Sequence, residues 1–116
     1  MVSQTELDMQ KRGDTEVISA LKRAGSDLSK PHQIEHHFVC PTPDSAKKIR
    51  EWGISHGLTA SEILDGEYQG LGYFFFDFIV PTVPTIENIF ADTGRFCQLA
   101  ADHGASYDGW GCLAVE

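Results

Sequence analysis

The sequence GYFFFDFIV at residues 72–80 is the most β-prone stretch of the chain, with four phenylalanines and a tyrosine within nine residues. Aromatic and β-branched side chains favour a pleated, half-buried strand. Alternation along the strand separates two faces, Phe74, Phe76, Phe78 and Val80 on one and Tyr73, Phe75, Asp77 and Ile79 on the other. Pro81 and Pro84 follow and end the strand. We therefore expect a strand whose Phe74 face packs in the core.

The segments before this strand predict a strand, a helix and a shorter strand. Residues 32–40 alternate between two faces, as a strand does. Thr42-Pro43-Asp44 is typical of a helix start, because threonine caps, proline fits the first position and an acid favours the N-terminal turn. We expect this helix to end at His56-Gly57 and to lead into a short strand at residues 58–64.

Two more helices and a last strand complete the prediction. Thr85 is expected to cap a helix that stops at His103-Gly104, before a strand at residues 106–115. At the N-terminus, residues 4–24 show helical spacing of their apolar side chains. The sequence leaves two alternatives at Gly13-Asp14: one continuous helix, or a helix that ends there and a second helix with Asp14 as its N-cap.

The order of these elements indicates the fold class. A leading helix at residues 1–25 is followed by a β-α-β-β-α-β sequence, and both inner helices end in His-Gly before a strand. This order predicts a ferredoxin-like α+β sandwich, in which a four-stranded antiparallel sheet carries two helices on one face. The strands at residues 32–40 and 72–80 would then lie in the centre. We expect one domain over residues 1–116, a typical length for a single domain.

Composition and charge limit the classes of partner. The chain carries 17 Asp and Glu against 9 Lys and Arg, for a net charge of −8. Such a protein repels phosphate backbones, so direct nucleic-acid binding is disfavoured and a basic protein surface is the natural partner. No apolar run is long enough for a membrane span, and the N-terminus does not resemble a signal peptide. We expect a cytoplasmic protein that binds neither membranes nor nucleic acid.

The three cysteines do not form a motif. Cys40, Cys97 and Cys112 are widely spaced, and no pair has the Cys-x-x-Cys spacing. Buried, reduced thiols are therefore expected, and no cofactor is predicted. A zinc site built from these cysteines and a histidine remains an alternative.

Four of the histidines have distinguishable expected roles. In Glu35-His36-His37, adjacent side chains point to opposite faces of a strand, so the two histidines cannot bind one metal ion. His36 shares the face of Phe38 and is expected in the core, whereas His37 lies on the other face. His56 and His103 precede glycines at helix ends, where we expect them to cap the helices.

The second face of the sheet is the candidate site. In this architecture helices cover one face only, and a face rich in aromatic and acidic residues is more typical of binding than of simple solvation. Within Tyr107-Asp108-Gly109-Trp110-Gly111, strict alternation places Asp108 and Trp110 on that face. The predicted partner-binding residues are Glu35, His37, Tyr73, Phe75, Asp77, Asp108 and Trp110.

Other uses of the same face remain as alternatives. His37, Asp77 and Asp108 meet on neighbouring strands and could hold a divalent ion or act as a base. The aromatic side chains could stack on single-stranded RNA, although arginines and lysines to hold the phosphates are missing from the rim. Self-association through this face is a further possibility, so the chain is expected to be a monomer or a weak dimer. No motif of a known catalytic class is present.

Three segments resemble a known family. Gly25-Ser26-Asp27, Ile34-Glu35-His36-His37-Phe38 and Tyr107-Asp108-Gly109-Trp110-Gly111 are similar, in order and spacing, to the regulator of ribonuclease activity B family. The resemblance implies a ferredoxin-like fold and a non-enzymatic protein that binds the endoribonuclease ribonuclease E. Binding would involve the scaffold region outside the catalytic domain and would alter RNA turnover.

One departure from the family pattern bears on the partner. Characterised relatives carry a long acidic C-terminal tail, whereas this sequence ends at Glu116, just past the last expected strand. The resemblance then implies either weaker binding to the basic scaffold of ribonuclease E or a related RNA-processing enzyme as the partner.

Overall fold

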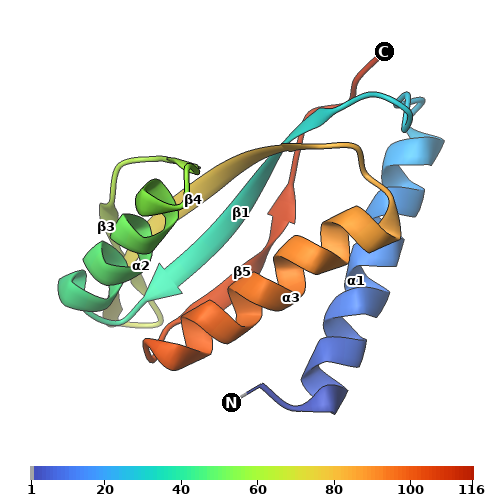
Figure 1. The fold of residues 1–116 in the computed structure, drawn as a ribbon. Helices are drawn as coiled ribbons and strands as arrows, with labels where there is room; N and C mark the ends of the chain where they lie inside the picture. Colours follow the sequence, from blue (N-terminus) through green and yellow to red (C-terminus); the bar gives the residue numbers. More distant parts are fainter. Residues whose placement is uncertain (1) are drawn as a thin grey trace.

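The computed structural model describes residues 2–116, with all their side chains except that of Tyr68. It is a mixed α+β fold (Figure 1). In chain order the elements are α1 (Gln4–Arg23), β1 (His32–Cys40), α2 (Pro43–Ser55), β2 (Thr59–Ala60), β3 (Leu64–Tyr68), β4 (Leu71–Thr82), α3 (Ile86–Asp102) and β5 (Ser106–Gly111). Among the described residues, no helix combines the length and apolar character needed to cross a membrane.

The sheet has five antiparallel strands in the order β2-β4-β1-β5, with β3 also paired to β4. The expected central positions of β1 and β4 are confirmed. The expected number of four strands is wrong, because the strand expected at residues 58–64 is only the two-residue β2, and a further strand, β3, follows it. β4 is 12 residues long, so β2 pairs near its end and β3 pairs near its beginning as a hairpin.

The starts of α2 and α3 confirm the sequence signals. Thr42 Oγ1 accepts a hydrogen bond of 3.1 Å from the backbone N–H of Ser45, and Pro43 occupies the first turn. In the same way, Thr85 Oγ1 accepts one of 3.1 Å from Asn88 N–H. Each threonine satisfies an N–H group that has no partner within its helix, which fixes where the helix begins.

The ends of both helices are capped by histidine, as predicted. His56 Nδ1 lies 2.7 Å from the carbonyl oxygen of Trp52, and His103 Nδ1 lies 3.0 Å from that of Leu99. Because a carbonyl can only accept, Nδ1 donates in each case. The ring therefore satisfies a carbonyl of the last turn, and the glycine that follows turns the chain toward the next strand.

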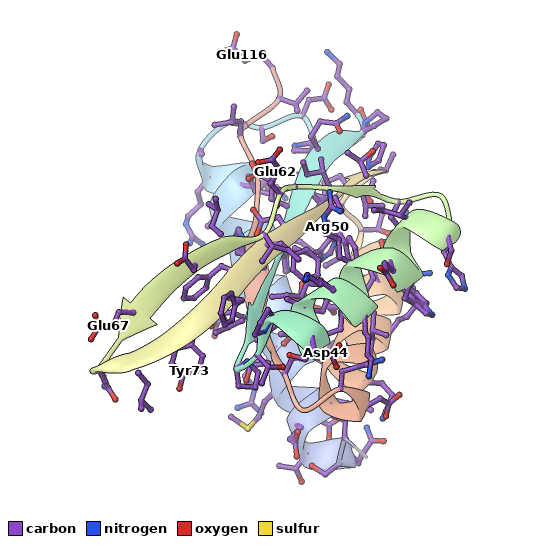
Figure 2. The ribbon with its side chains drawn as sticks, turned by 90° about the vertical axis from the view of Figure 1, so that its left-hand side faces the viewer. Asp44, Arg50, Glu62, Glu67, Tyr73 and Glu116 are labelled. Carbon is purple, nitrogen blue, oxygen red and sulfur yellow. The ribbon has the colours of Figure 1, made fainter. Side chains whose placement is uncertain are left out.

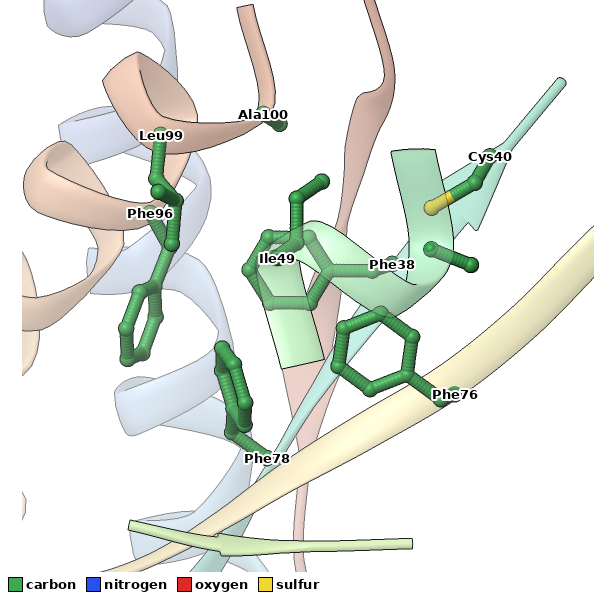
Figure 3. Close-up of a cluster of buried hydrophobic side chains, with 9 residues drawn as sticks. Phe38, Cys40, Ile49, Phe76, Phe78, Phe96, Leu99 and Ala100 are labelled. Atoms are coloured by element: carbon green, nitrogen blue, oxygen red, sulfur yellow. The ribbon is translucent and has the colours of Figure 1, made fainter. Parts of the chain in front are cut away.

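The main core lies between the sheet and the pair α2 and α3 (Figure 3). Its buried members are Phe38, Cys40, Ala46, Ile49, Phe76, Phe78, Phe96, Leu99 and Ala100. Phe38 is central, because its ring stacks on Phe76 at 5.3 Å and meets Phe78 and Phe96 edge to face. The prediction that the Phe74 face of β4 packs in the core is confirmed, since Phe76 and Phe78 are buried there.

Helix α1 is continuous from Gln4 to Arg23, so the possible break at Gly13-Asp14 does not occur. The helix packs on α3 and buries Leu21 in a second apolar cluster. A glycine inside a helix costs only about 1 kcal/mol, which burial of the neighbouring side chains offsets. The segment expected as an extension is therefore part of the packed structure.

The cysteines are unpaired, as expected. Burial raises the pKa of all three thiols, and that of Cys97 reaches about 11. Within residues 2–116, no group of three or more His, Cys, Asp or Glu side chains is placed to hold a metal ion. The described side chains therefore do not form the alternative zinc site.

Candidate functional site

One face of the sheet is turned away from α2 and α3 (Figure 2). The cross-strand register brings Phe75, Val39 and Ser106 into one row, with Asp77 beside His37 in the next. We call this surface the open face; it consists of Glu35, His37, Val39, Tyr73, Phe75, Asp77, Ile79, Ser106 and Asp108. Six of the seven predicted partner-binding residues lie on it.

A histidine–carboxylate pair lies near the middle of the open face. His37 Nδ1 is 2.8 Å from Asp77 Oδ1, between directly opposed residues of β1 and β4. An ionised carboxylate only accepts, so Nδ1 donates and Nε2 is left to meet a ligand. Both side chains remain partly exposed, at 42% and 29%. The pair is therefore accessible to a partner.

The proposed three-residue metal site is not formed. Asp108 is on β5 across from His37, but across residues 2–116 no set of three potential ligands has the arrangement that a metal requires. Two side chains in a hydrogen bond do not complete a coordination shell. The alternative of a divalent ion at His37, Asp77 and Asp108 is therefore wrong. His37 and Asp77 form a hydrogen-bonded pair, and Asp108 is a separate carboxylate on the neighbouring strand.

A pocket of about 440 Å³ opens next to this pair, toward the turn of the β3–β4 hairpin. We call it the hairpin pocket; it is lined by Val39, Glu67, Tyr73, Phe75, Ser106 and Asp108. The rings of Tyr73 and Phe75 are 6.4 Å apart and inclined by 53°. Gly66 permits this packing, because a Cβ there would lie 2.8 Å from the Phe75 ring.

The basic residues are unevenly distributed between the helices and the sheet. None of the strands described within residues 2–116 contains a lysine or an arginine. The basic residues are Lys11, Arg12, Lys22, Arg23, Lys30, Lys47, Lys48, Arg50 and Arg95, which lie on the helices or in the α1–β1 loop. The strands carry Glu35, Asp65, Glu67, Asp77 and Asp108. Three of these acids, Glu35, Asp77 and Asp108, lie on the open face, which is therefore anionic as well as aromatic.

The prediction that Trp110 lies on the open face is wrong. Trp110 is only 8% exposed and pairs with His36, on the helix side of the sheet. A β-bulge shifts the register between His36 and Phe38, and Gly109 there has φ +87°. The extra residue of a bulge reverses the alternation that follows it, so Tyr107 and Trp110 both face the helices.

The indole of Trp110 is bound by a buried acid of α1 that the sequence prediction missed. Trp110 Nε1 donates to Asp14 Oδ1 at 2.9 Å, and Thr93 Oγ1 donates to Asp14 Oδ2 at 2.6 Å. Gln10 Nε2 adds a third hydrogen bond of 2.8 Å. Asp14 is 1% exposed. Its position one turn before Val17, on the apolar side of the helix, was the sequence signal for burial.

His36 is a core residue, as predicted. It is fully buried, and its Nδ1 shares a hydrogen bond of 2.7 Å with the hydroxyl of Tyr107. Its edge meets the ring of Phe96 at 4.7 Å. Burial, with smaller contributions from His37 and Arg95, lowers the pKa of His36 to about 3. The ring is therefore neutral in the folded protein near pH 7.

The Gly25-Ser26-Asp27 segment also has a structural role. Ser26 Oγ lies 2.6 Å from His32 Nε2 and accepts a hydrogen bond of 2.9 Å from Val115 N–H. The backbone N–H of Asp27 donates to the carbonyl oxygen of Val115. This motif therefore joins the α1–β1 loop to the chain that follows β5.

We expect the Gly109→Ala variant to be less stable than the wild type by about 1–2 kcal/mol. Gly109 has φ +87°, where a side chain strains the backbone. A Cβ there would meet no other atom within 4 Å, so the loss reports backbone strain alone. Urea unfolding measures the difference. The control is Gly111→Ala in the same strand, whose effect should stay within about 0.5 kcal/mol; equal effects would contradict the bulge.

Comparison with known proteins gives one consistent result. The sequence model of the family described as "Regulator of ribonuclease activity B" matches residues 11–112. A protein of that name from Pseudoalteromonas atlantica is 32% identical over 105 residues, covering 87% of each chain. One from Alteromonas mediterranea is 33% identical over 100 residues, covering 83% of this chain and 74% of its own. One from Pseudoalteromonas translucida is 28% identical over 102 residues, covering 87% and 92%. The matched region includes the open face and the hairpin pocket.

Proposed function

Because the chain belongs to the regulator of ribonuclease activity B family, we propose that it is a non-enzymatic protein that binds a ribonuclease and regulates it. The proposed partner is ribonuclease E or a related RNA-processing enzyme of the cytoplasm, bound through a basic scaffold segment outside its catalytic domain. Regulation of this kind alters RNA turnover. No cofactor takes part in the proposed function.

The observation that carries this proposal is the charge of the open face. The open face carries three acidic residues and no basic residue, beside the partly buried rings of Tyr73 and Phe75. An anionic surface attracts a basic segment over several ångströms and repels RNA, while desolvated aromatic rings supply the short-range contacts. A basic protein segment is therefore the partner that this surface fits best.

We place partner binding on six residues of the open face, Glu35, His37, Tyr73, Phe75, Asp77 and Asp108. Their side chains lie on the three neighbouring strands β4, β1 and β5. Trp110 is left out, because its indole is buried against α1 and could meet a partner only after α1 had moved. In this proposal Trp110 is part of the family motif because it stabilises the domain, not because it contacts the partner.

We also infer that the fold is a single ferredoxin-like domain over residues 1–116. Support comes from the central positions of β1 and β4 and from the packing of α2 and α3 on one face. The β3 strand and α1 are then additions to that arrangement. This architecture leaves the opposite face for a partner.

We expect a charge reversal on the open face to weaken ribonuclease binding. The double variant Glu35→Lys with Asp108→Lys should bind purified ribonuclease E at least about tenfold more weakly, because like charges then meet at the interface. Calorimetry gives the affinity, and RNA cleavage in the presence of each protein gives the inhibition. Wild-type affinity should fall as salt rises.

The control places the same charge change on the helices. Glu16 on α1 and Glu51 on α2 are exposed, so Glu16→Lys with Glu51→Lys alters net charge equally without touching the open face. Equal losses in both double variants would mean that only net charge matters. Normal cleavage at saturating wild-type protein would reject the regulatory function itself.

A further inference from the structure

We propose that the hairpin pocket binds the guanidinium group of an arginine in the basic segment of the partner. This inference rests on the proposed function and specifies which side chain is recognised, and where. The pocket volume of about 440 Å³ lies within the range of ligand sites. It is large enough for one long side chain to enter from the open face.

The aromatic walls suit a planar cation. Tyr73 and Phe75 lie two residues apart on β4, with ring centroids separated by 6.4 Å. The inclination of 53° between the rings means that a guanidinium stacked on one ring presents its edge toward the other. Arginine combines stacking with the cation–π attraction of such faces.

Two acidic residues line the pocket from different elements. Glu67 is on β3 near the outer end of the hairpin, where Figure 2 also places Tyr73, whereas Asp108 is on β5 at the bulge. Both residues are exposed. The lining residues include no lysine or arginine that would neutralise them. The five N–H donors of a guanidinium suit carboxylate oxygens, and Asp108 lies on the same face of the sheet as the two rings.

Other ligands fit the pocket less well. A metal ion needs three or more ligands, and no such group occurs in the part of the chain that the structure describes. An apolar ligand would remove the hydration of Glu67 and Asp108 without replacing it. Lysine carries a compact charge with no flat surface to stack on a ring. Arginine matches both the rings and the carboxylates.

The surroundings of the pocket favour an extended basic segment rather than an isolated arginine. The Phe75–Val39–Ser106 row of the pocket adjoins the pair of His37 and Asp77, and Glu35 lies two residues further along β1. A chain that leaves the pocket along β1 would meet these acceptors in succession. The pocket then fixes the register of the segment along the open face.

The test uses a small probe of known structure. The full chain, labelled with ¹⁵N, is titrated with Nα-acetyl-L-arginine amide and, in parallel, with the matching citrulline compound, which has the same shape without the charge. Amide shifts are expected at Val39, Tyr73, Phe75, Ser106 and Asp108 with the arginine compound, and much weaker shifts with citrulline.

Variants decide whether the pocket is the site. Glu67→Gln, Asp108→Asn and Tyr73→Leu should each weaken arginine binding by roughly two- to fivefold. Glu51→Gln on α2 removes one charge elsewhere and should leave binding unchanged. Shifts spread over distant carboxylates, equal response to citrulline, or unchanged affinity in Glu67→Gln and Asp108→Asn would overturn the proposal.

Ribonuclease assays separate this inference from the function on which it rests. If the wild type inhibits ribonuclease E but arginine does not bind in the pocket, the proposed function stands and the pocket assignment fails. If arginine binds as expected but ribonuclease E is unaffected, the pocket recognises a basic segment of another protein, and the proposed function fails.

Discussion

The Asp14→Ala variant is expected to lose about 3–5 kcal/mol of unfolding free energy, because it leaves two buried donors without an acceptor. Trp110 Nε1 and Thr93 Oγ1 both donate to this carboxylate, which is only 1% exposed. Each buried donor without a partner costs about 1–3 kcal/mol, and the space left by the side chain adds to the loss. Urea unfolding followed by tryptophan fluorescence measures the effect.

Matched variants test whether the network or the helix causes this loss. Asp8→Ala removes an exposed acid from the same helix and should change stability by less than about 0.5 kcal/mol. Thr93→Val removes one donor and should cause a smaller loss than Asp14→Ala. If Asp14→Ala were as stable as Asp8→Ala, the carboxylate would not hold α1 against α3 and β5.

The unfolding free energy is expected to fall as the pH is lowered from about 6.5 to 3, because of the buried ring of His36. Burial lowers the pKa of His36 from 6.5 to about 3, so in this window the unfolded chain binds a proton that the folded chain excludes. Stability therefore rises with pH across the window and levels off above it. The full difference corresponds to about 5 kcal/mol.

A variant isolates this contribution from that of the carboxylates. His36→Leu with Tyr107→Phe removes both members of the hydrogen bond, so no new unpaired group is buried. Its stability should depend less steeply on pH between 6.5 and 3 than that of the wild type. Denaturant titrations at a series of pH values give both slopes. Parallel slopes would show that His36 is protonated without unfolding.

Much of the fold follows from local signals that no distant contact overrides. Thr42 and Thr85 cap helices where the sequence predicts, and β1 has the predicted bounds His32–Cys40. The alternation in β4 correctly places Phe76 and Phe78 in the core. These features depend on periodicity and capping, which can be read within a few residues.

The errors arise where one residue or a distant partner decides the outcome. Alternation in β5 fails at Gly109, since a single bulge residue sends Trp110 to the opposite face. Asp14 resembles a helix cap until its partners on α3 and β5 are known. Neither the bulge nor a contact between residues 96 apart can be read from local pattern.

The candidate site can likewise be predicted only in part, because local alternation gives some of its residues and distant strand pairing decides the rest. Alternation assigns Glu35, His37, Tyr73, Phe75 and Asp77 to one face, and the structure places them there. The hairpin pocket was not predicted, because its remaining wall depends on how β3 folds along β4. A short strand with glycine and acidic residues has little β-preference, so its pairing is decided by β4.

The hydrogen bond between Asp14 and Trp110 has a consequence for folding while the chain is being synthesised on the ribosome. The chain is made from its N-terminus, so α1 emerges long before the tryptophan that its aspartate binds, 96 residues later. Until then Asp14 lacks the hydrogen bond from Trp110, and the apolar side of α1 lacks part of the surface against which it packs. The domain can therefore complete its packing only after β5 has been synthesised.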